Sequence, residues 1–543
     1  MRITRREFLK LSAIASAALA AEIYMPDKIF PQAKNVKSFP AGPCRYCAVG
    51  CTTIAECEVD EKGNILKVLA IKGDKNSSVN RGVLCTKGFY LHKALEYPGR
   101  PVNPMIRKEW LNPKTGKPDL SNSPRVLQGK TSKDPDGLKP SEIDLKENFV
   151  EISWEDAIEF VANAVEKAVK EHGKFSVAYY GSGQLGTEET HIMNKVFKGG
   201  GLLANNSIEG QPRTCMASAV VGYLYTFGKD EPYGSLDDID VPDPDYKKHA
   251  DTFFIIGSNI AEAHPIIFNR IAAVKSKNPD KVKVIIADPR KTRSGVIGDI
   301  WLPISSGRDI ALINSMAYVI AFELDNAKYD LEKGEVSANW KYLDKKFIYR
   351  HVSFGIHEDV KKIWIKTEYG GVRGTAWDLS YTNTPRSVYP DPKKKYNSED
   401  EIEKDLWKGF AIFLRFLEDY KPEKVADAIF EGESPLIYDR TSKTWKKISG
   451  PEAIRIAAKW FAEGYVVTCW TMGVNQKLQG SWVNASLHLL HLITGKVCKP
   501  GRHSFSFTGQ PNACGGLRAI NFNAVNSLSG SPITLTVYLA VSS

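Results

Sequence analysis

Three apolar runs have the pattern of buried β-strands, and each is followed by small or polar residues. They span positions 175–183, 252–259 and 282–290. Strands that end in Gly, Ser, Asn or Asp and precede helices are typical of a doubly wound α/β sheet. Ligands of such sheets lie beyond the carboxyl ends of the strands, where glycines let the backbone approach phosphates. The pattern predicts mostly parallel sheets and a large phosphate-bearing cofactor, although a GxGxxG fingerprint for NAD is absent.

Other stretches predict elements of different kinds. Ser153 precedes an acidic first turn and an apolar-periodic run to about residue 171, which indicates a capped helix. Alternating apolar positions over 65–71 predict strands near the start of the chain. The segment 103–147 is rich in Pro, Lys, Asp, Ser and Gly, and 380–403 is rich in Pro, Asp and Asn. Both are expected to be surface loops.

The candidate chemistry begins with a cysteine cluster, Cys44-Arg-Tyr-Cys47-Ala-Val-Gly-Cys51, followed by Cys85. Three closely spaced thiolates and one remote thiolate are a common ligand set for a cubane iron–sulfur cluster. A zinc site also uses four sulfurs but usually draws them from two separated pairs. Structural disulfides are the third reading. The spacing favours iron and sulfur and leaves the other two open.

The N-terminus has the features of an export signal. Arg5 and Arg6 precede Phe-Leu-Lys and a weakly apolar run over 11–21, and Ala18-Leu-Ala20 fits a cleavage site. The run is too short to span a bilayer. A twin-arginine signal is therefore predicted, with the mature protein in the periplasm. This route carries proteins already folded around their cofactors, which agrees with a preloaded redox centre.

Composition narrows the class of protein further. Hydrophobic residues make up 43% of the 543 positions and charged residues 25%, which is ordinary for a globular chain of several domains. The net charge of +10 is modest for this length, and Lys and Arg are interspersed with Asp and Glu. Nucleic-acid binding is thus not indicated. No later apolar run is long enough to suggest a membrane span.

At Cys215 the chain resembles a known family. The motifs that carry this resemblance, besides the cysteine cluster, are Gln211-Pro-Arg-Thr-Cys215-Met216-Ala-Ser-Ala, Gly257-Ser-Asn259-Ile-Ala-Glu262-Ala-His-Pro, Trp470-Thr-Met472-Gly-Val-Asn-Gln476 and Thr508-Gly-Gln-Pro-Asn-Ala-Cys514-Gly. In this order they resemble the molybdopterin oxidoreductases, and among them the periplasmic nitrate reductases. The resemblance implies a small iron–sulfur domain followed by interleaved α/β domains.

The resemblance also implies a set of cofactors and ligands. A [4Fe-4S] cluster is expected on Cys44, Cys47, Cys51 and Cys85, and a molybdenum held by two molybdopterin guanine dinucleotides and by the Cys215 thiolate. Lys87 matches the lysine between cluster and pterin. Asp288 follows a strand and is placed to accept from a guanine amine, while Gln211 stands where the family often has Asn. The full set of cofactor-binding positions expected from the match is Lys87, Gln184, Gln211, Cys215, Gly257, Ser258, Asn259, Glu262, Asp288, Asp309, Met472 and Gln476.

The reaction implied by the resemblance is oxygen-atom transfer from nitrate. Arg518 matches an arginine near the substrate channel, and Met216 stands where formate dehydrogenases of this fold tend to carry His. Met cannot handle a proton, so nitrate is favoured over formate. A formate dehydrogenase, a thiosulfate or polysulfide reductase, and a non-catalytic remnant that keeps only the cluster are the alternatives. The implied partners are a c-type cytochrome donor, the twin-arginine export machinery and a maturation chaperone.

The domain organisation follows from these assignments. We expect a signal peptide over 1–33, a cluster domain over 34–100, α/β domains over 101–209 and 210–500, and a return segment over 501–543. After Arg518 no charged residue occurs to the end of the chain. The resemblance implies that relatives continue into a C-terminal β-rich domain. We therefore expect a truncated or frame-shifted product that lacks this domain and binds its molybdenum cofactor poorly or not at all.

Overall fold

The computed structural model describes residues 35–95, 97, 100–121, 145–197, 208–210, 217–227, 234–242, 248–356, 387–391, 394–507 and 509–511. The chain forms two compact units. The larger contains Met1–Phe89 and Pro212–Ala513, and the smaller contains Tyr90–Gln211 and Cys514–Ser543. The expected signal peptide and the residues Gln211, Cys215, Met216 and Arg518 lie outside the described residues.

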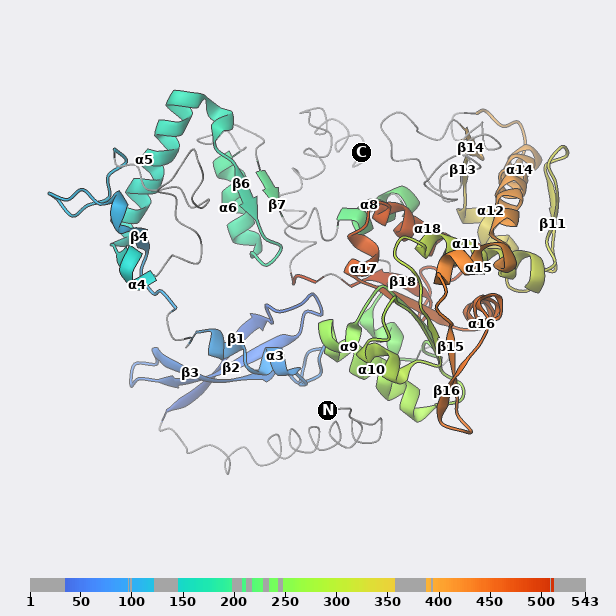
Figure 1. Ribbon diagram of the computed structural model, residues 1–543, viewed down its shortest axis with the longest axis horizontal. Helices are drawn as coiled ribbons and strands as arrows, with labels where there is room; N and C mark the ends of the chain where they lie inside the picture. The colour runs from blue at the N-terminus through green and yellow to red at the C-terminus, as the bar shows by residue number, and fades with distance from the viewer. Residues whose placement is uncertain are drawn as a thin grey trace. The chain divides into compact units, whose positions relative to one another are not determined.

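The cysteine-rich start of the chain folds on a three-stranded antiparallel sheet, in the order β1–β2–β3 (Figure 1). The strands are β1 (Val36–Pro43), β2 (Thr52–Val59) and β3 (Ile65–Gly73). Alternate residues of β2 are buried, as expected for a sheet with one covered face. The strands predicted around the cluster are therefore confirmed.

The larger unit is built on a seven-stranded sheet with the order β16-β15-β10-β9-β8-β17-β18. Its strands are β8 (Thr252–Ile256), β9 (Lys283–Ala287), β10 (Ile300–Leu302), β15 (Leu436–Asp439), β16 (Thr444–Lys447), β17 (Val466–Trp470) and β18 (His503–Ser506). The five strands from β10 to β18 pair in parallel, while β15 and β16 add an antiparallel edge. Every residue of β8 and β17 is buried. The predicted doubly wound, mostly parallel sheet is confirmed.

The strand order places a topological switch in the middle of this sheet. From β8 the chain continues outward to β9 and β10, whereas β17 and β18 continue on the other side of β8. Crossovers on the two sides of such a point diverge and leave a crevice at the carboxyl ends of the strands. The helices that connect its strands include α10 (Pro265–Lys277), α11 (Asp309–Tyr318), α16 (Gly450–Glu463) and α18 (Gly480–Ile493), while α8 (Ala217–Phe227) precedes β8.

Helix α14 (Glu399–Leu417) corrects one expectation from the sequence. It begins inside the segment 380–403, whose composition predicts a loop. Ser398 caps it by accepting a hydrogen bond from the amide of Glu401 at 3.3 Å. Three acidic residues occupy its first turn, where they interact favourably with the helix dipole. The composition of the segment is thus that of a helix start as well as of a loop.

The smaller unit contains α5 (Trp154–His172) and α6 (Thr187–Phe197) with two short two-stranded sheets. These pair β4 (Met105–Arg107) with β5 (Phe149–Glu151), and β6 (Tyr179–Gly181) with β7 (Ile208–Gly210). The capped helix predicted after Ser153 is confirmed, because the Ser153 hydroxyl accepts from the Asp156 amide at 3.0 Å. The buried strand predicted over 175–183 is largely wrong. Residues Lys174–Ser176 form a 3-10 turn, and only Tyr179–Gly181 form a strand. The Ser176 hydroxyl donates to backbone carbonyls of the preceding helix end, which favours the turn.

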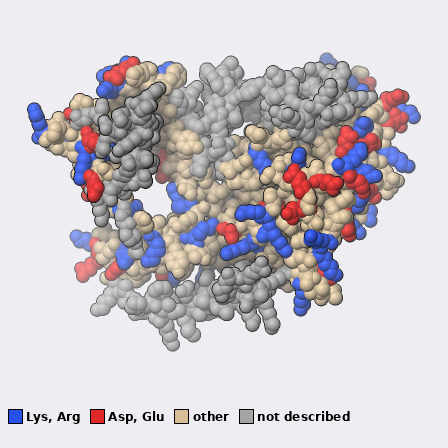
Figure 2. Space-filling model, viewed as in Figure 1, with Lys and Arg blue, Asp and Glu red and all other residues tan. Residues whose placement is uncertain are grey.

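No helix within the described ranges has the length and apolar character of a membrane span. Acidic and basic side chains are intermixed on the face shown in Figure 2. This distribution agrees with the interspersed charges of the sequence.

A partly buried ion network connects the cluster domain to the large sheet domain within the larger unit. The Arg270 guanidinium of α10 is 8% exposed and donates to Asp237 at 2.7 Å and to both carboxylate oxygens of Asp240. Arg81, from the loop before Cys85, donates to the same two carboxylates at 3.0 and 3.1 Å. Arg270 also reaches the carbonyls of residues 78 and 79 at 3.4 Å. The loop is therefore anchored by charge as well as by packing.

We expect Arg270→Met to lower the free energy of unfolding by about 2–3 kcal/mol, since it removes buried charge-assisted hydrogen bonds while Arg81 still pairs with both carboxylates. Arg415→Met, which breaks a half-exposed pair with Glu418 at 3.4 Å, is the control and should cost less than about 1 kcal/mol. Urea unfolding followed by circular dichroism measures both. Equal losses in the two variants would contradict the structural role of the network.

Lys496 stabilises the C-terminal end of α16 from inside the core. It is 7% exposed, and its ammonium group donates to the carbonyls of residues 461, 462 and 464 at 2.6–2.8 Å. A cation at this end of a helix also interacts favourably with the helix dipole. Burial nevertheless lowers the pKa of Lys496 to about 7 from its ordinary value of 10.5. Protonation of this lysine is therefore coupled to folding.

This coupling predicts a pH dependence. Between pH 7 and 10 the unfolded chain binds the Lys496 proton more tightly than the folded chain, so stability rises with pH. Relative to Lys496→Met, the wild-type free energy of unfolding should rise by up to about 1.4 kcal/mol per pH unit over this range. The measurement is urea unfolding at several pH values, with Lys459→Met as an exposed control on α16. Parallel profiles for wild type and Lys496→Met would show that the coupling is absent.

Candidate cluster and cofactor site

The four expected cluster ligands are brought together by two loops. The amide of Cys44 donates to the carbonyl of Cys51 at 2.8 Å, which closes the first loop. Gly50 adopts a positive φ of 76° within it, a conformation that favours glycine. Cys44, Cys47 and Cys51 are buried, and Cys85, directly before α3 (Thr86–Phe89), is partly exposed. None of the four is in a disulfide.

The four thiols lie near enough to one another for each charge to affect the titration of a neighbour. Burial raises the pKa of Cys51 to about 12, and the neighbouring thiols of Cys47, Cys44 and Cys85 contribute to the same rise. Four soft sulfur donors are the ligand set that an iron–sulfur cluster requires. Among the described residues, no group of three or more His, Cys, Asp or Glu side chains is arranged around the position of a single metal ion.

Gly88 brings the backbone of α3 close to the Cys44 sulfur. A Cβ at Gly88 would lie 3.4 Å from the Cys44 Sγ, at van der Waals contact. The chemistry of the donors therefore fits a cluster held by Cys44, Cys47, Cys51 and Cys85.

Lys87 links the cluster loops to the sheet domain. Its ammonium group donates to the carbonyls of Glu262 at 3.0 Å and Ala263 at 3.3 Å, in the short helix α9 (Ile260–Ala263) after β8. The same positive charge lowers the pKa of Cys44 and Cys47, against the stronger effect of burial. Lys87 thus connects the loop of Cys85 to α9, which follows the carboxyl end of β8.

The carboxyl ends of β8 and β17 meet at the switch point with almost no space between them. The amide of Gly473 donates to the carbonyl of Gly257 at 3.1 Å, and the Thr471 hydroxyl donates to the same carbonyl at 3.2 Å. A Cβ at Gly473 would lie 2.4 Å from that oxygen, closer than a side chain tolerates. Gly257 has a positive φ of 55°. Two glycines are therefore required for this contact.

The turn after β8 is held by hydrogen bonds that leave one hydroxyl unused. Asn259 donates to Glu262 at 2.8 Å and accepts from the Ser294 hydroxyl at 2.9 Å. Ser258 is 3% exposed, and its hydroxyl has no hydrogen-bond partner among the described residues. Buried polar groups are rarely left unpaired, and a bound ligand is a common explanation. This hydroxyl therefore fits a polar cofactor at the carboxyl edge of the sheet.

Charged groups gather at the same edge beyond β9 and β10. Asp309 is 1% exposed at the start of α11 and forms an ion pair with Lys477. Burial raises the pKa of Asp288, the first residue after β9, and the charges of Arg290 and Lys477 oppose this shift. The short helix α17 (Met472–Asn475) follows β17 and is succeeded by the exposed Gln476.

Apart from Lys87, the described cofactor positions of the larger unit lie at the carboxyl edge of the sheet or in the turns beside it. They are Gly257, Ser258, Asn259, Glu262, Asp288, Asp309, Met472 and Gln476. Gln184 belongs to the smaller unit, where its backbone amide donates to the Ser182 hydroxyl at 3.2 Å. Eight of the twelve expected positions therefore lie at or beside this edge of the larger unit.

Sequence reasoning missed three residues at this edge. Lys477 neutralises Asp309, Thr471 donates to the Gly257 carbonyl, and Gly473 makes the close contact with that carbonyl. All three lie within or directly beside the motif Trp470-Thr-Met472-Gly-Val-Asn-Gln476. Their position next to expected cofactor residues could have indicated that they belong to the site. Their partners could not be identified in this way, because these lie directly after β8 and in α11, which are distant in sequence.

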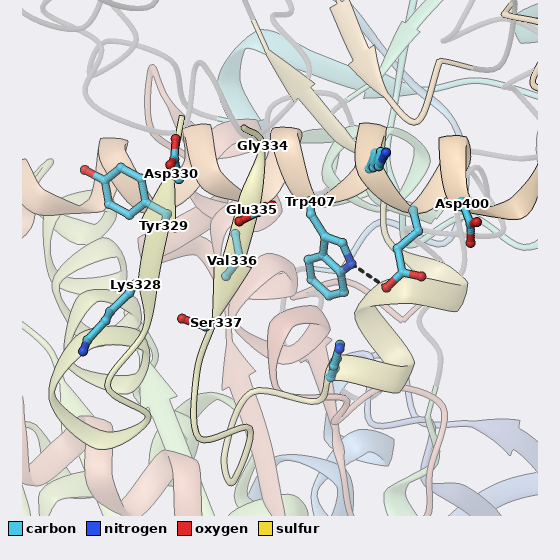
Figure 3. A pocket seen from close by; sticks show the side chains of 12 residues that line it. Lys328, Tyr329, Asp330, Gly334, Glu335, Val336, Ser337, Asp400 and Trp407 are labelled. Carbon is cyan, nitrogen blue, oxygen red and sulfur yellow. Dashed lines mark hydrogen bonds between the residues drawn. The ribbon is translucent and has the colours of Figure 1, made fainter. Parts of the chain in front are cut away.

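A cavity of about 590 Å³ lies elsewhere, between the hairpin of β11 (Lys328–Asp330) and β12 (Glu335–Ser337) and helix α14. Figure 3 shows the Trp407 indole facing this cavity, with Asp400 on the same helix. The indole nitrogen donates to Glu403 at 2.9 Å. None of the expected site residues lines the cavity.

Comparison with known proteins decides the family. Residues 100–535 match the family model described as "Molybdopterin oxidoreductase", and residues 39–96 match the "Molybdopterin oxidoreductase Fe4S4 domain". The chain belongs to the molybdopterin oxidoreductase family. The match over residues 39–96 supports an iron–sulfur cluster in the domain that contains the four cysteines, rather than a zinc site or structural disulfides. The second cofactor of the family is a molybdopterin, which the polar carboxyl edge of the sheet is suited to bind.

Two curated members of the molybdopterin oxidoreductase family are similar to most of this chain. "Nitrate reductase" of Symbiobacterium thermophilum is 37% identical over 527 residues, and "Periplasmic nitrate reductase" of Desulfovibrio desulfuricans is 35% identical over 521 residues. Each alignment covers 95% of this chain and 51% of the relative. The chain thus spans about half the length of these relatives.

A solved structure, "Acetylene Hydratase from Pelobacter acetylenicus", aligns with a TM-score of 0.48 and 16% identity, and the alignment covers 85% of this chain and 43% of that one.

The cluster assignment predicts different outcomes for two buried cysteines of the same domain. Cys51→Ser should remove the cluster, because a hydroxyl is a poor ligand for iron. Cys57→Ser should retain it, since Cys57 is 1% exposed within β2 and is not one of the four ligands. Iron and acid-labile sulfide per chain, with the EPR signal of the reduced cluster, measure the difference. Equal losses in the two variants would refute the ligand set.

Proposed function

We propose that this chain takes part in the reduction of nitrate to nitrite, with electrons supplied through the [4Fe-4S] cluster. The overall balance is nitrate plus two electrons and two protons, giving nitrite and water. The observation that carries the proposal is the Lys87 bridge, which connects the cluster ligands to α9 at the carboxyl edge of the sheet. Both curated relatives above are named as nitrate reductases.

The cofactor, when bound, supplies a molybdenum that accepts an oxygen atom and cycles between oxidation states. We assign Cys215 as its protein ligand and propose the guanine dinucleotide form with two pterins. Gly257, Ser258 and Asn259 would bind the cofactor from the β8 side. Met472 and Gln476 would bind it from the β17 side, and Lys87 would hold α9 against the cluster loops.

The acidic residues and the remaining amides complete the proposed cofactor site. Asp288 and Asp309 would accept hydrogen bonds from guanine groups, with Lys477 holding the Asp309 carboxylate in place. Glu262 would keep the turn after β8 in place through Asn259, which donates to it at 2.8 Å. Gln184 and Gln211 are proposed as further amide contacts to the pterins.

Substrate selection is proposed to depend on charge and on the residue beside the metal ligand. Nitrate is a small monoanion, so a cationic group near the metal would attract it, and Arg518 is assigned this role. Met216 provides no group that exchanges a proton, which favours nitrate over formate. Formate, thiosulfate and polysulfide are the substrates to compare.

The cellular location and the partners of the protein are proposed from its N-terminal sequence and from its relatives. The name of one relative includes the word periplasmic, and Arg5 and Arg6 fit a twin-arginine signal. We therefore propose export to the periplasm through the twin-arginine machinery, with a maturation chaperone and a c-type cytochrome as electron donor. We also propose the domain limits given above: 1–33, 34–100, 101–209, 210–500 and 501–543.

We expect the purified protein to oxidise reduced methyl viologen when nitrate is added, and not when formate or thiosulfate is added. Cys215→Ser should lower the rate by at least about 100-fold, since the metal loses its proposed thiolate ligand, while the EPR signal of the cluster remains. Viologen oxidation followed by absorbance measures the rate. Activity with formate instead of nitrate would refute the substrate, and a cluster signal without molybdenum would favour the non-catalytic alternative.

A further inference from the structure

Two buried asparagines form a closed hydrogen-bond network directly beside the α17 turn. Asn475 is 2% exposed and ends α17, and Asn484 is fully buried in α18. The Trp470 indole nitrogen donates to the Oδ1 atoms of Asn484 at 2.7 Å and Asn475 at 3.2 Å. Neither asparagine belongs to the cofactor positions proposed above.

Every side-chain polar group of the two asparagines is used. The Nδ2 of Asn484 donates to the Oδ1 of Asn475 at 3.1 Å and to the carbonyl of Gly480 at 2.7 Å. The Nδ2 of Asn475 donates to the hydroxyl of Ser506 at 2.7 Å. Because an indole nitrogen can only donate, both amide oxygens must face Trp470. The chemistry of the indole therefore fixes the orientation of both amides.

The network holds together four elements around the switch point. Trp470 is the last residue of β17, Ser506 the last of β18, Asn475 the last of α17, and Asn484 lies in α18. A fully satisfied buried network specifies one arrangement, because any other leaves polar groups unpaired. Within α17 and just after it lie Met472 and Gln476, the two proposed cofactor contacts on this side.

The same network reaches the helix that follows Cys215 in the sequence. A Cβ at Gly222 of α8 would lie 2.4 Å from the Cβ of Asn484, and a Cβ at Gly480 would lie 2.8 Å from the Ser218 hydroxyl. Helices α8 and α18 therefore approach each other closely at Asn484. The start of α8 lies two positions after Cys215 in the sequence.

We infer that Asn475 and Asn484 are positioning residues that hold the α17 turn in its cofactor-binding arrangement before the cofactor binds. The inference rests on the proposed cofactor site. In this proposal the two asparagine side chains do not contact the cofactor themselves. They act through Met472 and Gln476, whose backbone they fix relative to β8 and β17.

The test measures backbone hydrogen exchange in the cofactor-free chain and cofactor content in the chain produced with molybdenum. The variants are Asn475→Leu and Asn484→Leu. Leu490→Ala is the control, because it removes a buried apolar side chain from α18, 1% exposed, without touching the network. Measurements are made well below the melting temperature of every variant.

The amides of residues 473–476 are hydrogen-bonded within or beside the turn. In the asparagine variants they should exchange at least about ten-fold faster, since buried partners are left unpaired. The control should leave their exchange unchanged relative to other core amides. Molybdenum and GMP released by acid should fall at least about five-fold per chain in the asparagine variants only.

Each result decides one part of the inference. Unchanged exchange at residues 473–476 would overturn the positioning role, as would an equal effect of Leu490→Ala. Faster exchange with full molybdenum and GMP content would overturn the connection to the cofactor. A wild-type chain without molybdenum or GMP would count against the proposed cofactor site, while the exchange data alone would still decide whether the asparagines hold the turn.

Discussion

The close contact between the carboxyl ends of β8 and β17 is the constraint on which the larger unit depends. Gly473 donates to the Gly257 carbonyl at 3.1 Å, and no Cβ fits between the two backbones. This contact lies where the strand order reverses, so the turns after the two strands begin together and then diverge. The expected cofactor residues of both turns consequently lie at one edge of the sheet.

Buried polar groups, rather than apolar packing alone, connect this edge to its surroundings. Lys87 joins the cluster loops to α9, and Arg270 anchors the loop before Cys85 to α10. On the other side, Asn475 and Asn484 tie α17 to the neighbouring strands. Apolar contacts tolerate small displacements, whereas hydrogen bonds in the core require particular directions. The arrangement of cluster and sheet within the larger unit is therefore specified by directional interactions.

Some elements could be predicted from the sequence and others could not, and the difference has a physical reason. The strands 252–256 and 283–287 were predictable because their residues are almost all buried on both faces, which requires a continuous apolar run. The buried strand predicted from Phe175 onward was wrong because Phe175 and Tyr180 are largely exposed, so their apolar side chains do not indicate burial. The start of α14 was missed because Ser, Asp and Glu occur both in loops and in helix first turns.

The chemistry of the protein can be read from its residues alone: four thiols with iron–sulfur spacing, glycine-ended strands, and motifs that match the molybdopterin oxidoreductases. These features are local, since each depends on neighbouring residues in one segment. The folded chain is needed to establish that β8 and β17 are adjacent, that Lys477 pairs with Asp309, and that the buried Ser258 hydroxyl lies at the same edge. Such relations join residues far apart in the chain, and no local pattern records which distant partner a side chain will meet.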